Sequence, residues 1–133
     1  MNNKQAGNKF ESELCGKLAK IGFWAYNCAT KTSGQPADII AARNGKPYLI
    51  DAKECKRNIY DTNRIEENQK NAMFLWEMCG NGQGYFALKL ADDSIYMIDH
   101  NTMLLARQDK RVLNRQDIID LGTPFYDWEA SVP

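Results

Sequence analysis

The segment ADIIAARNGKPYLIDAKE, residues 37–54, decides the fold of this chain. It contains two strand-like runs separated by Asn-Gly at positions 44–45, the strongest short signal for a β-hairpin with a two-residue turn. Such a short loop fixes the register of the ladder, and in that register Asp38 lies directly opposite Asp51. We therefore predict an antiparallel hairpin that brings two aspartates face to face.

The second strand of this hairpin carries an acid and a base on one face. Side chains alternate along a strand, so Asp51 and Lys53 point to one side while Ile50 and Ala52 point to the other. Opposed carboxylates such as Asp51 and Asp38 repel unless something neutralises them. A divalent cation would do so, and Mg²⁺ combines a few carboxylate oxygens with water and phosphate oxygens. Lys53 beside such an ion could orient or help deprotonate a water, or stabilise charge on a phosphorane.

An amphipathic helix is predicted ahead of the hairpin, from about residue 8 to residue 21, and Gly22 ends it. Its apolar residues recur at intervals of three and four and are Phe10, Leu14, Leu18 and Ile21. Glu11 lies on the edge of that apolar face, so we expect it to look inward. The aromatic run at residues 23–29 favours a strand, and residues 31–36 have the composition of a loop.

A second helical pattern follows the hairpin. We predict that Asn63 caps it, with Glu66 three residues later, and that the glycine-rich residues 80–84 end it. The residues of its apolar face are Ile65, Ala72, Trp76 and Cys79. Gln69 lies in the middle of this face and is expected to point into the protein.

The rest of the chain predicts a second hairpin and a helical end. The runs YFALKL at residues 85–90 and SIYMI at residues 94–98 have strand composition and are joined by a short polar turn. Residues 101–133 favour one or two short helices and an aromatic tail that packs back on the protein or meets a partner. His100 is expected to be structural or exposed.

Length and composition are those of one ordinary globular domain over residues 1–133, with 44% hydrophobic and 26% charged residues. No apolar run approaches the ~20 residues that span a bilayer, and the N-terminus has no apolar signal segment, so we expect a cytoplasmic protein without membrane contact. The four cysteines and single histidine lack zinc-ligand spacing. Seventeen basic and 17 acidic residues give a net charge of zero, which argues against DNA binding through overall charge but allows a local basic patch.

The hairpin motif resembles the signature of PD-(D/E)XK nucleases, with PAD at residues 36–38 and DAK at residues 51–53. The resemblance extends to the preceding helix with Glu11 and the following helix with Gln69. It implies an α/β, restriction-endonuclease-like fold with an α-β-β-β-α-β core, in which helices flank a mixed central sheet. More narrowly, the chain resembles RecU-type Holliday junction resolvases, including short phage-encoded relatives. The stretches that carry this likeness are GNKFESEL (7–14), PADIIAARNGKPYLIDAKECK (36–56) and RIEENQ (64–69).

The resemblance implies a role for each of the site residues. Asp38 and Asp51 become metal ligands, and Glu11 is the acid of the first helix that completes or extends the metal site. Lys53 becomes the catalytic lysine, and Gln69 the glutamine on the helix behind the site. The implied cofactor is Mg²⁺, for which Mn²⁺ could substitute. Asp51 stands where RecU-type proteins usually have glutamate, an exchange that the wider superfamily tolerates.

Three basic residues follow the second hairpin strand, and beside a metal-phosphate site they are candidate contacts to DNA phosphates. These residues are Lys56, Arg57 and Arg64.

The function expected from these residues is that of a metal-dependent endodeoxyribonuclease that resolves four-way DNA junctions in recombination or phage DNA processing. Two symmetric cuts require two active sites, so a homodimer is expected. A nuclease of the same fold that acts on duplex ends, flaps or a restriction-like site would carry the same catalytic residues. A non-catalytic DNA-binding protein on this fold is the third alternative. The net charge of zero favours it, whereas the full catalytic set argues against it.

Overall fold

The computed structural model describes the backbone of residues 3–28 and 37–133 and the side chains of residues 9–28 and 37–133. The predicted loop at residues 31–36, the end of the predicted strand at Ala29, and Pro36 of the nuclease-like motif lie outside the described residues. In the part of the chain that is described, no helix is both long and apolar enough to cross a bilayer.

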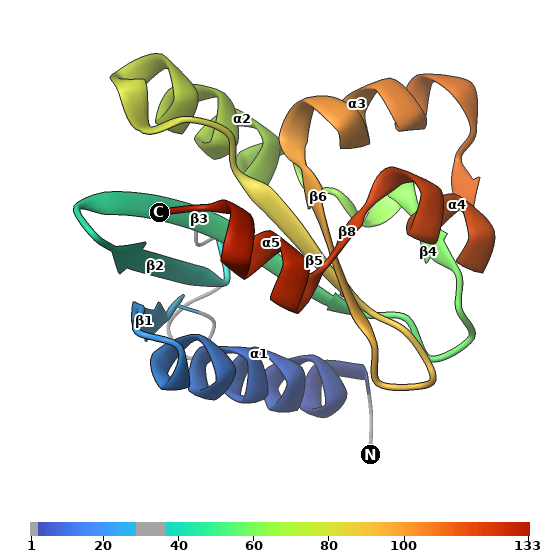
Figure 1. Ribbon diagram of the computed structural model, residues 1–133. Helices are drawn as coiled ribbons and strands as arrows, with labels where there is room; N and C mark the ends of the chain where they lie inside the picture. Colours follow the sequence, from blue (N-terminus) through green and yellow to red (C-terminus); the bar gives the residue numbers. More distant parts are fainter. Residues whose placement is uncertain (1–2, 29–36) are drawn as a thin grey trace.

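A six-stranded sheet forms the centre of the protein, with the strand order β1-β2-β3-β5-β6-β8 (Figure 1). The strands are β1 (Trp24–Asn27), β2 (Ile39–Arg43), β3 (Lys46–Glu54), β5 (Tyr85–Lys89), β6 (Ile95–Asp99) and β8 (Thr123–Pro124). β3 and β5 run parallel, and all other neighbours in this sheet are antiparallel. The predicted α/β class with a mixed central sheet and flanking helices is confirmed.

The hairpin predicted from the Asn-Gly pair is confirmed in position and in register. Asn44 and Gly45 have φ angles of 53° and 78°, the left-handed pair that a type I′ turn requires. The ladder pairs are Arg43–Lys46, Ala42–Pro47, Ala41–Tyr48, Ile40–Leu49 and Ile39–Ile50. In this register the next opposed residues are Asp38 and Asp51, at the point where β2 begins.

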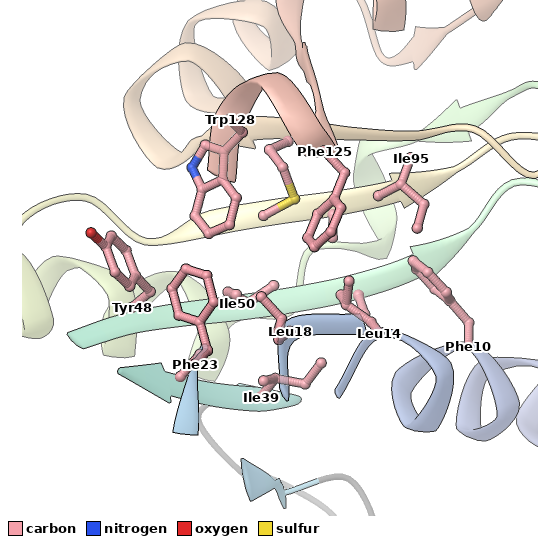
Figure 2. Close-up of a cluster of buried hydrophobic side chains, with 14 residues drawn as sticks. Phe10, Leu14, Leu18, Phe23, Ile39, Tyr48, Ile50, Ile95, Phe125 and Trp128 are labelled. Carbon is pink, nitrogen blue, oxygen red and sulfur yellow. The ribbon is translucent and has the colours of Figure 1, made fainter. Parts of the chain in front are cut away.

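Helix α1 (Asn3–Lys20) begins earlier than predicted and covers one face of the sheet together with α5 (Phe125–Ser131). The predicted apolar stripe of α1 is buried, in the residues Phe10, Leu14 and Leu18. Phe125 and Trp128 of α5 complete the same cluster, in which the Trp128 ring stacks on Phe23 at a centroid distance of 5.9 Å (Figure 2). The aromatic tail therefore packs back onto the protein.

Arg43 ties the end of the chain to this layer. Its Nη1 donates to Glu129 Oε1 at 2.6 Å and to the Ile21 carbonyl at 3.1 Å. Its Nη2 donates to the carbonyls of Glu129 at 2.7 Å and Val132 at 2.9 Å, and its Nε donates to the Pro133 carbonyl at 2.9 Å. The guanidinium therefore fixes the C-terminal residues against the turn after α1.

The opposite face of the sheet carries three helices and a two-stranded ribbon, which separate it from solvent (Figure 1). These elements are α2 (Glu67–Trp76), α3 (His100–Asp109), α4 (Arg115–Leu121), β4 (Tyr60–Asp61) and β7 (Val112–Leu113). Met73, Met103 and Ile118, one from each helix, are buried in a single cluster on this face. The sheet thus lies between two apolar layers.

The predicted start of the second helix at Asn63 is wrong. Residues Thr62–Arg64 form a short 3₁₀ turn, and α2 begins after Glu66. The Glu66 side chain accepts a hydrogen bond from the backbone of Gln69, and the Gln69 side chain accepts one from the backbone of Glu66. This reciprocal capping box satisfies the backbone donors of Glu66 and Gln69, so the helix begins after Glu66 rather than after Asn63.

The predicted apolar face of this helix is also partly wrong. α2 ends at Trp76 and continues as a π-helical turn, Glu77–Asn81, in which Gly80 has a φ of 89°. This change of winding turns Cys79 away from the core, so its side chain is exposed to solvent. Ile65 is buried, but it precedes the helix.

The second predicted hairpin is confirmed, since β5 and β6 pair in antiparallel fashion. Three helices, rather than one or two, follow it. His100 occupies a structural position: it is buried at the start of α3 and contacts the rings of Phe74 and Phe86.

Candidate active site

Asp51 lies at the centre of a buried polar cluster on β3. Its side chain is fully buried, and its strand is flanked by β2 and β5. Gln69 Nε2 donates to Asp51 Oδ1 at 2.9 Å, whereas Oδ2 has no hydrogen-bond partner among the described residues. The amide of Gln69 also accepts the backbone N–H of Glu66 at 3.5 Å. The capping box of α2 therefore orients the glutamine that holds Asp51.

Asp38 lies opposite Asp51, in the residue that precedes β2. Its backbone N–H donates to the Ile50 carbonyl at 3.2 Å, and its Oδ2 accepts the backbone N–H of Ala52 at 2.9 Å. These two bonds direct the Asp38 carboxyl group at β3. Burial raises the pKa of Asp51 well above its ordinary value, and the nearby charge of Asp38 adds to the shift. The structure thus brings the two aspartates together.

Lys53 projects to the same side of β3 as Asp51. Its Nζ lies 3.7 Å from Asp51 Oδ1, and its side chain is 18% exposed. The lysine therefore reaches from the buried carboxylate toward solvent, where a substrate could meet it.

Glu11 approaches the cluster from α1. It is 7% exposed, and its Oε2 has no partner among the described residues. The charges of Asp38 and Lys53 both act on its carboxyl group. The inward orientation predicted for Glu11 is confirmed by its burial.

Burial dominates the electrostatics of this cluster. Burial, and next the charge of Asp38, raise the pKa of Glu11 from 4.5 to about 7, while Lys53 lowers it. Burial also raises the pKa of Asp51 well above its ordinary value of 3.8; Lys53 opposes this shift, and the charges of Asp38 and Glu11 add to it. Without a cation, Glu11 and Asp51 therefore keep their protons at pH values at which ordinary carboxyl groups have lost them.

The oxygen atoms of this cluster fit a hard divalent cation that keeps several water ligands. Asp51 Oδ2 and Glu11 Oε2 are buried acceptors that have no hydrogen-bond partner in the described part of the chain, a costly arrangement unless a proton, water or ion satisfies them. Within residues 9–28 and 37–133, however, no three His, Cys, Asp or Glu side chains are arranged to hold a metal ion by themselves. Such a site is therefore not a complete protein cage, and it suits Mg²⁺, which commonly takes one or two carboxylates plus water and phosphate oxygens.

The predicted basic rim lies beyond the same end of β3. Lys56 and Arg57 are exposed in the turn that follows the strand. The Arg64 guanidinium lies 5.6 Å from the centre of the Tyr60 ring and donates to the Glu54 carbonyl at 3.4 Å. All three cations therefore lie close in sequence or space to the end of the strand that carries Asp51 and Lys53.

Tyr60 is a buried polar residue that the sequence pattern did not single out. It is fully buried on β4, and its hydroxyl has no hydrogen-bond partner among the described residues. Burial, and after it the charge of Asp51, raise the pKa of Tyr60 well above its ordinary value. No local pattern marks this tyrosine, because its burial arises from the packing of β4 in the apolar cluster on this face of the sheet.

Comparison with solved structures places this geometry in a known fold. The chain is similar to the 1.6 Å resolution structure of Archaeoglobus fulgidus Hjc, a Holliday junction resolvase from an archaeal hyperthermophile. The two sequences are 22% identical, and the match has a TM-score of 0.71 and covers 92% of this chain and 99% of the other. No curated protein matches the chain.

A sequence profile described as archaeal Holliday junction resolvase (Hjc) matches residues 2–129. This match includes the helix with Glu11, the hairpin with Asp38 and Asp51, and the second helix with Gln69. Because it spans nearly the whole chain, the protein belongs to the archaeal Holliday junction resolvase (Hjc) family of junction-resolving nucleases.

Proposed function

We propose that this protein is a metal-dependent endonuclease that hydrolyses DNA phosphodiester bonds at four-way junctions. The observation that carries the proposal is the buried pairing of Asp38 with Asp51, with Lys53 Nζ 3.7 Å from Asp51 Oδ1. An acid pair buried at this cost needs a compensating cation, and a lysine beside it can act on the same phosphate. Membership of a junction-resolving nuclease family supports the choice of substrate.

Asp38 and Asp51 are the proposed metal ligands, with Glu11 completing or extending the site. The proposed cofactor is Mg²⁺, for which Mn²⁺ could substitute. When bound, the ion supplies Lewis-acid activation of the attacked phosphate and neutralises the facing carboxylates. Gln69 holds Asp51 by its 2.9 Å hydrogen bond, so the carboxylate keeps one orientation while its second oxygen stays available.

Lys53 is the proposed catalytic lysine. Its Nζ lies beside Asp51 and its side chain reaches solvent, so it can contact a water and a phosphate at the same time. The ammonium group can orient or help deprotonate the attacking water, or donate to the phosphate oxygens as negative charge grows on them.

The basic rim of Lys56, Arg57 and Arg64 is proposed to bind DNA phosphates. Such contacts position a duplex arm without reading its sequence. A closer kinship with RecU-type resolvases within this class of nucleases also stays a proposal, supported by the motifs around Glu11 and Gln69.

A homodimer is the proposed assembly, because a four-way junction is cut at two symmetric positions. One candidate surface for a two-fold contact is formed by α2 and the π-helical turn after it. Phe74, Leu75 and Met78 are 38%, 61% and 82% exposed on this surface. Neighbouring large apolar side chains at such exposure are typical of a protein interface. Sedimentation of the L75D/M78D double variant should show a monomer if this surface makes the dimer.

The proposal is tested by incubating labelled four-way junctions with the protein in Mg²⁺, Mn²⁺ or EDTA. Cleavage should require the metal and produce nicks at positions related by the two-fold axis of the junction. Mixtures of wild-type and K53A subunits should leave mostly single-nicked junctions, since each mixed dimer keeps one active site. Cleavage in EDTA would contradict the metal-dependent mechanism, and unpaired cuts would contradict the symmetric dimer.

A further inference from the structure

Two aromatic side chains are exposed on β1, the strand at one end of the sheet order (Figure 1). Trp24 and Tyr26 are 65% and 41% exposed. Their rings are nearly parallel, with an interplanar angle of 11° and a distance of 6.3 Å between the centroids. Ala25, between them, packs against the apolar cluster that α1 covers. The strand is therefore anchored through Ala25, and the core does not explain the two exposed rings.

The strand register places both rings on the face of the sheet that carries the candidate active site. Tyr26 pairs with Ile40, and Ile40 pairs in turn with Leu49. Directly opposed residues of antiparallel strands share a face, and so do residues two apart on one strand. Leu49 lies two residues before Asp51 on β3, and Trp24 lies two residues before Tyr26. Both rings therefore project to the same side of the sheet as Asp51.

The aromatic pair is also close to the acid pair. The Cys28 N–H donates to the Asp38 carbonyl at 2.7 Å, so these two residues are opposed at the end of the ladder. Tyr26 is thus a diagonal neighbour of Asp38, a relation that puts the Cα atoms about 7–8 Å apart. The basic rim follows the end of β3, whereas the rings lie level with Leu49, before Asp51. Asp51 therefore lies between the rim and the rings.

We propose that Trp24 and Tyr26 form a stacking surface for DNA bases that are unpaired where the junction branches. The inference rests on the proposed function, which brings a branched DNA to this face. Exposed aromatic rings stack on any base, and each such contact contributes about 1–3 kcal/mol to binding. Paired bases are already stacked within a duplex, so the rings select bases that have left their pairs. A strand with one phosphate at the acid pair then places neighbouring phosphates on the rim and an unpaired base on the rings.

The area of the two rings argues against a second copy of this chain as the occupant. A stable protein interface buries about 800 Å² on each partner. An aromatic side chain contributes about 150–250 Å² when buried, so the exposed parts of Trp24 and Tyr26 offer less than about 500 Å². The proposed two-fold contact on α2 uses other residues.

The experiment measures the affinity for a four-way junction in EDTA at several salt concentrations. The test variant is W24T/Y26T, because threonine suits a strand and removes the rings. Its Kd should rise about fivefold or more, which corresponds to the loss of at least one stacking contact. The slope of log K against log salt should stay that of wild type, because stacking releases no counterions. W24F/Y26F keeps two rings and should recover most of the affinity, and an unchanged Kd for W24T/Y26T would overturn the inference.

Tyr126 provides a matched control. It is 60% exposed on α5, which covers the opposite face of the sheet. Y126A should keep the Kd within about twofold of wild type, as is usual for a surface substitution away from a site. A loss as large as that of W24T/Y26T would show a general effect of removing an exposed ring and would overturn the inference.

A fluorescent base reports the contact directly. 2-Aminopurine at the branch point of the junction should lose fluorescence when saturating wild-type protein stacks on it, and saturating W24T/Y26T should cause much less loss. The same base placed within a duplex arm should respond equally to both proteins. Equal quenching by the two proteins at the branch point would refute the stacking contact.

Three outcomes separate this inference from the proposed function. If wild type binds linear duplex as tightly as the junction, the proposed substrate itself fails. If wild type prefers the junction and W24T/Y26T prefers it as strongly, only the role of the rings is refuted. If W24T/Y26T sediments as a monomer while wild type is a dimer, the rings form a subunit contact, and the inference is refuted in favour of that assignment.

Discussion

Replacing Glu11 with glutamine should stabilise the metal-free protein, and more at high pH than at low pH. The pKa of Glu11 is raised from 4.5 to about 7, mainly by burial and then by the charge of Asp38. A carboxyl group with a raised pKa favours folding fully below its unfolded pKa, and that contribution is lost as the pH rises through the folded pKa. Glutamine cannot ionise, so E11Q avoids the loss.

The size of the effect follows from the two pKa values. Because of this shift, Glu11 lowers the free energy of unfolding by about 3 kcal/mol at pH 8 but by only about 1 kcal/mol at pH 5. At pH 5 Glu11 is protonated in the folded protein and still partly protonated in the unfolded chain. For a domain of this length, 3 kcal/mol corresponds to roughly 10 °C in melting temperature. The gain of E11Q over wild type should therefore shrink steadily between pH 8 and pH 5.

The assay is urea denaturation in EDTA at four pH values between 5 and 8.5. E13Q on the same helix is the matched control, because Lys89 Nζ donates to the Glu13 carboxylate at 2.7 Å. Removing that partnered charge should not stabilise the protein at any pH in the series. The reasoning would be refuted if the free energy of unfolding of E11Q followed wild type in parallel across the whole range.

Three other predictions concern catalysis, binding and the C-terminal residues. K53A should lower the rate of junction cleavage at least 100-fold while its affinity for the junction, measured by gel shift, stays within about threefold of wild type, because the lysine is proposed to act on the nucleophile or the developing charge. Joint replacement of Lys56, Arg57 and Arg64 with alanine should weaken binding to all DNA sequences alike and reduce the slope of log K against log salt by about 0.9 per lost phosphate contact; an unchanged slope would exclude these residues as phosphate contacts. R43A should lower the free energy of unfolding by about 2–4 kcal/mol, since it removes the Arg43 hydrogen bonds to the Glu129 carboxylate and to four carbonyl groups. A loss below about 0.5 kcal/mol in urea denaturation would contradict this reasoning.

The hairpin at the centre of the fold could be predicted from the sequence because its signals are local. A two-residue turn of Asn44 and Gly45 permits one register, and that register alone brings Asp38 opposite Asp51. The apolar stripe of α1 could be predicted for the same reason, because helix periodicity is visible without any knowledge of the partner surface.

The second helix was harder to predict because two local signals compete. Asn63 with Glu66 and Glu66 with Gln69 are both possible caps, and packing decides for the second because it lets Gln69 reach Asp51. Sequence could not reveal the burial of Tyr60, since it depends on how β4 packs against the sheet. Nor could sequence reveal the change of winding at Gly80, which turns Cys79 outward.

We propose that the cluster of Asp38, Asp51 and Lys53 cuts four-way junctions in preference to other DNA. The most direct measurement compares the rates at which excess protein cleaves a labelled four-way junction and a linear duplex of the same arm sequence, for wild type and D51N, in Mg²⁺. Wild type should cut the junction at paired positions at least 100-fold faster than the duplex, and D51N should cut neither. Duplex cleavage as fast as junction cleavage would contradict the resolvase function, and junction cleavage by D51N at the wild-type rate would contradict the site.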